Sequence, residues 1–198
     1  MRRLLLARHG ESEWNAEGRW QGRADPPLSG HGRKQAALAV DRLGVVDAIV
    51  SSTLQRALET AMIISEGLGV GPVVLEPELV ERDAGEWQGL TRNEIEAAFP
   101  GYLDSHRRPP SYELDEPLVV RVLAALTGVC QAIPGDDLLI VTHGGVINAL
   151  ERHLGLEWQR VPNLGGRWFV WNNGELHLGD RIELIDHDAV TTQERDQL

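Results

Sequence analysis

The sequence is short of several features that mark particular classes of protein. It has 1 cysteine, so no internal disulfide can form and a zinc site built from several cysteines is excluded. Cys130 lies in an apolar helical pattern, and we expect it to be a small core residue. No segment approaches the ~20 apolar residues of a membrane span, and the apolar run behind Arg2 and Arg3 is too short for a signal peptide. We therefore expect a soluble, cytoplasmic protein.

Positive charge is also scarce. The 19 Lys and Arg residues face 30 Asp and Glu residues, which gives a formal net charge of -11. Nucleic acids and anionic membranes bind basic surfaces, so neither is an expected partner. An anionic ligand would have to be held by local cations, because distant charges are screened beyond about 8 Å at physiological salt. The sequence leaves both a monomer and a homodimer open.

Short apolar runs alternate with helical patterns along the chain. Strands are expected at residues 3–8, 47–50, 73–75, 138–141, 167–171 and 176–185. Helices are expected from Ser29 to Leu43, from Leu54 to Ile64, at 116–132, and from Val146 to Leu154. This alternation predicts right-handed βαβ units and a three-layer α/β/α fold with a mostly parallel sheet. The Asn-Gly turn between the last two strands predicts a hairpin, which adds an antiparallel edge strand.

The length of 198 residues fits one domain, and we expect a single domain over residues 1–198. Residues 10–29 and 79–87 are expected to be loops. Residues 91–115 resemble a small cap insertion. Thr91 can cap a short helix there, and the basic loop Ser105–Pro110 follows it.

Two of the expected strands end in the same way, in Arg8-His9-Gly10 and in Thr142-His143-Gly144. Carboxyl ends of parallel strands share one edge of a sheet, where ligands bind in open α/β folds. The glycine after each histidine permits close backbone approach to a ligand. Either histidine alone would pass for a loop residue, but two in the same context favour a site.

Arg56 follows the second strand and falls in the first turn of the next helix. A cation there opposes the helix macrodipole, whereas a bound phosphate would reverse that effect. Taken by itself, Arg56 fits better as a solvated surface arginine.

An ordered set of motifs resembles the histidine phosphatase superfamily, also known as the phosphoglycerate mutase-like or RHG family. The Arg-His-Gly string alone is weakly diagnostic, but the ordered set is highly specific and runs from about residue 3 to 150. Its members are Leu6-Ala7-Arg8-His9-Gly10-Glu11-Ser12, Gln21-Gly22, Ser51-Ser52, Arg56-Ala57, Glu59-Thr60, Glu81, Gly85, Trp87-Gln88-Gly89 and Thr142-His143-Gly144-Gly145. The resemblance implies the phosphoglycerate mutase-like fold.

The resemblance also implies roles for individual residues. His9 is the nucleophile that becomes phosphohistidine, and Glu81 is the proton donor to the leaving oxygen. The residues implied to bind the phosphoryl group are Arg8, Asn15, Gln21, Gly22, Arg56, His143 and Gly144. No metal or organic cofactor is implied, and the partner is a small phosphorylated metabolite. Glu78 and Glu86, in the same loop, are alternative candidates for the proton donor. Glu81 is preferred only because its spacing to Gly85 and Trp87 matches the family.

These roles fit the chemistry of phosphoryl transfer. Charge spreads over the equatorial oxygens in the transition state, so catalysis is mainly positioning and electrostatic stabilisation. His9 must be neutral when it attacks. An alkoxide is a poor leaving group, so a general acid should add ~10²–10⁴ in rate. Because Glu81 must start protonated, we expect an acidic to neutral pH optimum.

Phosphatase activity is favoured over mutase activity by length. The mutases of the family carry a long insertion between the acid and the second histidine, whereas here the gap is 62 positions (143 minus 81). Many phosphatases of this kind carry Gly-Glu-Ser where this chain has Asp115-Glu116-Pro117, so Glu116 is the candidate for the family glutamate. We expect hydrolysis of a small phosphomonoester, with phosphoglycerate mutase second and a non-catalytic phosphoprotein-binding module third. Arg107 and Arg108 in the cap are either solvated charges or selectors of anionic substrates.

Overall fold

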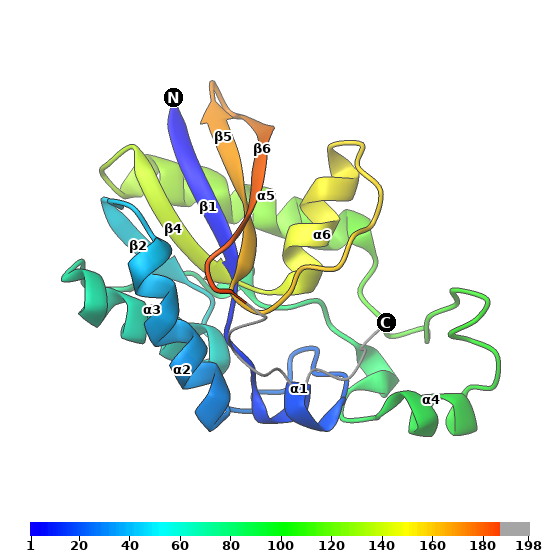
Figure 1. Cartoon of the computed structure of the whole chain (residues 1–198). Helices are drawn as coiled ribbons and strands as arrows, with labels where there is room; N and C mark the ends of the chain where they lie inside the picture. The colour runs from blue at the N-terminus through cyan, green and yellow to red at the C-terminus, as the bar shows by residue number, and fades with distance from the viewer. Residues whose placement is uncertain (187–198) are drawn as a thin grey trace.

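A six-stranded sheet forms the centre of the computed structural model, which describes residues 1–186 (Figure 1). The strand order is β3-β2-β4-β1-β5-β6. The strands are β1 (Arg2–Arg8), β2 (Ala48–Ser51), β3 (Val74–Leu75), β4 (Asp137–Thr142), β5 (Gly165–Asn172) and β6 (Glu175–Glu183). The helices are α1 (Glu13–Glu17), α2 (Gly30–Ala39), α3 (Gln55–Leu68), α4 (Arg92–Ala98), α5 (Asp115–Ala132) and α6 (Gly144–His153).

Strand β1 occupies the middle of the sheet. It pairs in parallel with β4 and antiparallel with β5, in a register that sets Arg8 opposite Thr142. Leu4, Leu5 and Leu6 are fully buried. A continuous apolar run is what a strand covered on both faces needs, so the strand predicted over residues 3–8 is confirmed.

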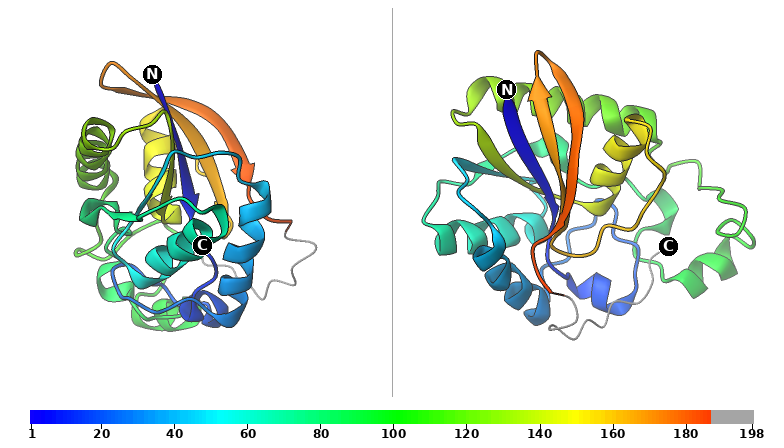
Figure 2. Two further views of the ribbon diagram at one scale, coloured as in Figure 1. Left: turned by 90° about the vertical axis from the view of Figure 1, so that its left-hand side faces the viewer. Right: turned by 45° about the horizontal axis from the view of Figure 1, so that its top comes forward.

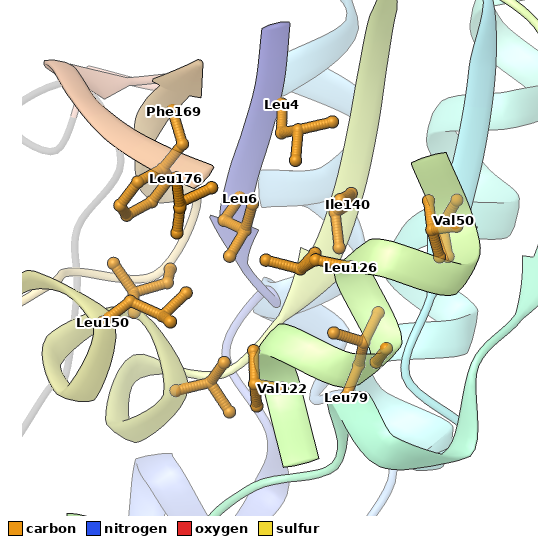
Figure 3. Close-up of a cluster of buried hydrophobic side chains, with 14 of the residues drawn as sticks. Leu4, Leu6, Val50, Leu79, Val122, Leu126, Ile140, Leu150, Phe169 and Leu176 are labelled. Carbon is orange, nitrogen blue, oxygen red and sulfur yellow. The ribbon is translucent and has the colours of Figure 1, made fainter. Parts of the chain in front are cut away.

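Helices cover both faces of the sheet (Figure 2). On one face, Leu6 and Ile140 lie against Leu126 of α5, as Figure 3 shows, and α6 packs beside them. On the other face, Ala61 and Ile64 of α3 pack in the same cluster as the opposite side chains of β1 and β4. The two clusters place the sheet between two helical layers, which confirms the three-layer α/β/α fold.

The hairpin at the end of the chain contributes two strands. Its first strand, β5, pairs antiparallel with β1, and β6 then forms the edge of the sheet. β5 is antiparallel to both of its neighbours, and the edge strand β6 is antiparallel to β5, so the expected antiparallel edge strand is confirmed. A two-residue turn forces this arrangement, because β6 can lie only beside β5.

The predicted helix starts at Ser29 and Thr91 are confirmed. Ser29 Oγ accepts a hydrogen bond from Gly32 N at 2.9 Å, and Thr91 forms a capping box with Glu94. The helix expected to reach Leu43 instead ends as α2 at Ala39 and continues as the 3-10 turn η1 (Val40–Arg42).

Two segments expected to be loops contain short helical turns. Residues 10–29 include α1. The segment 79–87 begins at the last residue of the 3-10 turn η2 (Pro77–Leu79) and contains the 3-10 turn η3 (Gly85–Trp87). Helices of three to five residues are too short to show a hydrophobic period, which is why the sequence pattern did not predict them.

Helix α4 and the loop after it project to one side of the sheet (Figure 1). This segment has a small core of its own, in which Trp87 packs with Ile95 and Leu103. The single domain with a cap at residues 91–115 stays a prediction, and residues 187–198 of it lie outside the described residues. Across residues 1–186, no helix has the length and apolar character that crossing a membrane requires.

Candidate active site

The two histidines that end β1 and β4 lie side by side. His9 N donates to Thr142 O at 3.0 Å, which continues the pairing of the two strands. The ring centroids of His9 and His143 are 5.2 Å apart, in an edge-on arrangement. The structure therefore brings together at one sheet edge two residues that are 134 positions apart (143 minus 9).

A cavity of about 1050 Å³ opens over this edge. The predicted site residues that line it are Arg8, His9, Asn15, Gln21, Gly22, Arg56, Glu81, Arg108 and Gly144. Two predicted residues, His143 and Arg107, are not among the lining residues. His143 is fully buried beside His9, and the Arg107 guanidinium stacks on the Tyr102 ring at 4.3 Å.

The His9 imidazole is held in one tautomer. Its Nδ1 lies 2.6 Å from Gly10 O. A carbonyl oxygen only accepts, so Nδ1 carries the hydrogen and Nε2 keeps its lone pair. Arg56 Nε donates to that Nε2 at 3.2 Å. Burial, followed by the charges of Arg56 and Arg8, holds the His9 pKa well below its usual 6.5, so the ring is neutral at physiological pH.

Arg56 is a buried cation with a fixed orientation. Its side chain is 1% exposed and donates to Ala24 O at 2.8 Å and to Gly22 O at 2.9 Å. Burial lowers the Arg56 pKa to about 10, against the opposing charges of Glu81 and Asp25. The guanidinium still carries its charge at neutral pH, at the start of α3, where the helix dipole also favours an anion.

His143 is bound on one side only. Its Nε2 lies 2.8 Å from Ser52 Oγ, and its buried Nδ1 has no hydrogen-bond partner in the described part of the chain. Burial lowers the His143 pKa well below 6.5, and the charge of Arg56 adds to that effect. Two neutral imidazoles thus lie beside the cations of Arg8 and Arg56, and His9 is the one that lines the cavity; we call this end of the cavity its floor.

Glu81 faces the second strand end. Its two carboxyl oxygens accept hydrogen bonds from Arg82 N at 2.7 Å and from Gly145 N at 3.0 Å. A Cβ on Gly145 would lie 2.3 Å from Glu81 Oε1, so only glycine permits this approach. Of the three glutamates considered for the acid, Glu81 lines the cavity and Glu78 and Glu86 do not.

The loop after β1 supplies further lining residues of the cavity, Asn15, Gln21 and Gly22. Asn15 Oδ1 accepts from Ser12 N at 3.1 Å, and Gln21 Oε1 accepts from Ser12 Oγ at 2.8 Å. From β1 itself, Arg8 donates to Val161 O at 2.8 Å. These bonds fix the side chains by backbone and buried hydroxyl partners from two segments, at Ser12 and at Val161.

The outer wall of the cavity carries further cations that the sequence analysis missed. They are Arg82, Arg92, Arg152 and Arg160, and they join Arg108 and the two floor arginines. Seven arginines thus face three carboxylates in the lining, in a chain whose net charge is -11. A helical period could have found Arg152, because it lies eight residues after Gly144 on the same face of α6.

Comparison with known proteins agrees with this geometry. Residues 4–177 match the family model of the histidine phosphatase superfamily (branch 1). A glucosyl-3-phosphoglycerate phosphatase of Mycolicibacterium vanbaalenii is 38% identical over 181 residues, which cover 84% of this chain and 80% of that protein. A metal-independent phosphoserine phosphatase of Arabidopsis thaliana is 36% identical over 193 residues, which cover 92% and 79%.

A solved structure shows the same fold. It is that of a mycobacterial glucosyl-3-phosphoglycerate phosphatase in complex with VO3, with a TM-score of 0.79 and 29% identity. The match covers 89% of this chain and 96% of that one. The chain belongs to the histidine phosphatase superfamily.

Proposed function

We propose that this histidine phosphatase hydrolyses a small phosphomonoester in two steps, through a phosphohistidine on His9. In the first step Nε2 of His9 attacks phosphorus, the ester P–O bond breaks, and Glu81 gives a proton to the leaving oxygen. In the second step water attacks phosphorus and the P–N bond breaks. Glu81 takes a proton from that water, inorganic phosphate leaves, and His9 is neutral again.

The observation that carries this proposal is the fixed tautomer of His9. The hydrogen bond from Nδ1 to Gly10 O leaves the nucleophilic lone pair on Nε2, directed at the guanidinium of Arg56. A phosphoryl oxygen bound by that guanidinium would bring phosphorus close to Nε2. Positioning of this kind supplies much of the rate in phosphoryl transfer.

Arg8, Arg56 and His143 are the proposed ligands of the phosphoryl oxygens, with Asn15 and Gly22 at the same end of the cavity. Two guanidiniums stabilise the charge that spreads over those oxygens in the transition state. The Nδ1 atom of His143 is buried without a hydrogen-bond partner among the described residues, so it can form a hydrogen bond only with a ligand or a water. A phosphoryl oxygen is the ligand that we propose for it.

The arginines of the outer wall support a substrate whose alcohol part carries an anionic group of its own. Arg108 stacks between Trp87 and Tyr112, at 5.1 and 5.6 Å from the two ring centroids, and has no carboxylate partner among residues 1–186. The named relatives act on small phosphorylated molecules, which favours a metabolite as the substrate. The cytoplasmic location, and a monomer or homodimer, stay predictions from the sequence.

The experiment that tests the proposal traps the intermediate. Wild-type protein is mixed with excess phosphate ester and quenched, and acid-labile phosphate is located by mass spectrometry. We expect the label on His9, and we expect His9→Ala to lose both label and turnover. His177→Ala, which removes an exposed histidine of β6, is the control and should retain both. Turnover that survives in His9→Ala would overturn the proposal.

Product analysis separates hydrolysis from the mutase alternative. The protein is incubated with 3-phosphoglycerate, with and without 2,3-bisphosphoglycerate. Release of inorganic phosphate in both reactions is the expected result. Accumulation of 2-phosphoglycerate that depends on the bisphosphate would show a mutase instead.

A further inference from the structure

Two buried side chains hold the backbone around Gly10 from behind. Thr60 Oγ1 accepts a hydrogen bond from Gly10 N at 3.0 Å, and Gln35 Oε1 accepts one from Glu11 N at 2.8 Å. Thr60 on α3 and Gln35 on α2 are both 0% exposed, and neither lines the cavity. Both side chains bond to the backbone on either side of Gly10, so their effect on the reaction would pass through Gly10.

The contact of Gln35 leads directly to the nucleophile. Glu11 N and Gly10 O belong to the same peptide unit, and Gly10 O is the acceptor for Nδ1 of His9. A peptide that donates through its N–H becomes a better acceptor through its carbonyl, because the two bonds polarise one another. Gln35 is therefore joined to the His9 imidazole by a chain of two hydrogen bonds through one peptide.

The contact of Thr60 leads to the anion-binding arginine as well. Its hydroxyl accepts from Gly10 N and donates to the backbone carbonyl of Arg56 at 2.7 Å. One hydroxyl thus ties the residue after the nucleophile to the first turn of α3, which carries Arg56. The distance between the His9 imidazole and the Arg56 guanidinium is therefore fixed by the backbone bonds of Thr60 as well as by the direct contact of the two side chains.

The space around Gly10 leaves its backbone little freedom to settle elsewhere. A Cβ on Gly10 would lie 2.6 Å from Gly32 O, because the start of α2 packs directly against this turn. This packing opposes a shift of the turn toward α2, and the bonds to Thr60 and Gln35 oppose a shift away from it.

We propose that Thr60 and Gln35 are positioning residues that clamp Gly10, so that His9 keeps its hydrogen on Nδ1 and presents Nε2 to the substrate beside Arg56. The inference rests on the proposed function, in which His9 is the nucleophile. It adds that the tautomer of His9 is enforced by side chains that never touch the substrate.

The test compares three threonine variants. Thr60→Val keeps the shape but removes the hydroxyl, and Thr60→Ser keeps the hydroxyl. Thr127→Val is the matched control, since Thr127 makes the same bond to the carbonyl one turn back, at 2.7 Å to Leu123 O, but has no second partner among the described residues. We expect kcat to fall on the order of tenfold to a hundredfold in Thr60→Val, with a smaller change in KM, and to stay within about threefold in the other two.

A spectroscopic measurement separates positioning from a general loss of structure. The 15N chemical shifts of the His9 ring report which nitrogen carries the hydrogen. We expect a single Nδ1–H tautomer in wild type, Thr60→Ser and Thr127→Val, and a mixture in Thr60→Val. Gln35→Met, which removes the acceptor at similar length, should show the same mixture and serves as the second variant if Thr60→Val does not fold.

Two results would overturn the inference. One is a folded Thr60→Val or Gln35→Met with wild-type kcat and an unchanged tautomer. The other is an equal loss of kcat in Thr60→Val and Thr127→Val. Failure of the proposed function would give a different result, namely turnover that survives in His9→Ala. The 15N shifts of the His9 ring can be read in every Thr60 and Gln35 variant whether or not the variant is active.

Discussion

The floor of the cavity, around His9 and Arg56, and the side formed by residues 103–114, which we call the cap side, are built in different ways. On the floor, His9 and Arg56 are 2% and 1% exposed; His9 bonds to the carbonyl of the adjacent Gly10, and Arg56 bonds to the carbonyls of Gly22 and Ala24 in another segment. On the cap side, Arg107 and Arg108 are exposed, and they lean on aromatic rings. The reacting groups are thus fixed before a substrate arrives, whereas Arg108, which would contact the alcohol part, is exposed. Chemistry and selectivity should therefore respond differently to mutation.

The largest effect is expected on the floor, from Glu81→Gln. Loss of the general acid should lower kcat by ~10²–10⁴ for an alkyl phosphate. The loss should be much smaller in the first step for an aryl phosphate, since its leaving oxygen needs less protonation. Steady-state and burst kinetics with both esters measure this. Glu78→Gln, outside the cavity, is the control, and an equal loss in that variant would contradict the role of Glu81.

The buried histidines of the floor should make the fold sensitive to acid. The pKa values of His9 and His143 are lowered below 6.5 in the folded protein, so the unfolded chain binds more protons below that pH. The free energy of unfolding should fall as the pH drops below about 6.5, by up to about 1.4 kcal/mol per pH unit for each histidine. Urea unfolding at pH 7.5, 6.5 and 5.5 measures the slope.

Single variants test whether the buried histidines cause this pH dependence of the free energy of unfolding. His143→Asn should reduce the pH dependence below pH 6.5 by about half, because one of two such groups is removed. His106→Asn, an exposed histidine of the cap, should leave the slope unchanged. A wild-type unfolding free energy that stays flat from pH 7.5 to 5.5 would contradict the expectation.

Gly145→Ala tests how closely the floor is packed. The new methyl group would lie 2.3 Å from Glu81 Oε1, so the carboxyl group must move. We expect kcat to fall on the order of tenfold, without loss of thermal stability, because alanine favours the helix by about 1 kcal/mol over glycine. Gly128→Ala on α5, where no atom lies within 4 Å, should raise the melting temperature and leave kcat alone.

The smallest effect is expected on the cap side. Arg108→Ala should raise KM severalfold for esters whose alcohol part is anionic and leave kcat nearly unchanged, since a partly exposed ion pair is worth about 1 kcal/mol or less. Arg107→Ala, which alters a neighbour outside the cavity, should change neither constant. If Arg108→Ala lowers kcat as Glu81→Gln does, the division between floor and cap is wrong.

Much of this architecture could be predicted from the sequence, because its signals are local. Leu4 to Leu6 are apolar without interruption, as a strand covered on both faces requires, and Ser29 and Thr91 begin helices as caps do. The paired strand ends predicted that His9 and His143 would meet, and the structure confirms that they do.

The parts that could not be predicted depend on contacts between distant segments. No local pattern shows that Thr60 accepts from Gly10, or that Arg152 of α6 faces the cavity beside Arg108 of the cap. The position of β5 inside the sheet likewise depends on which strand it pairs with, and a turn signal does not contain that information.

The central place of β1 has a consequence for the order in which activity arises during synthesis. Its two partners, β4 and β5, both come from the last third of the described chain. At roughly 5–20 residues per second, His9 is translated about 7–27 s before His143. A growing chain therefore carries the His9 imidazole for several seconds before β4 and β5 can pair with β1, and dephosphorylation can begin only after β5 has been made.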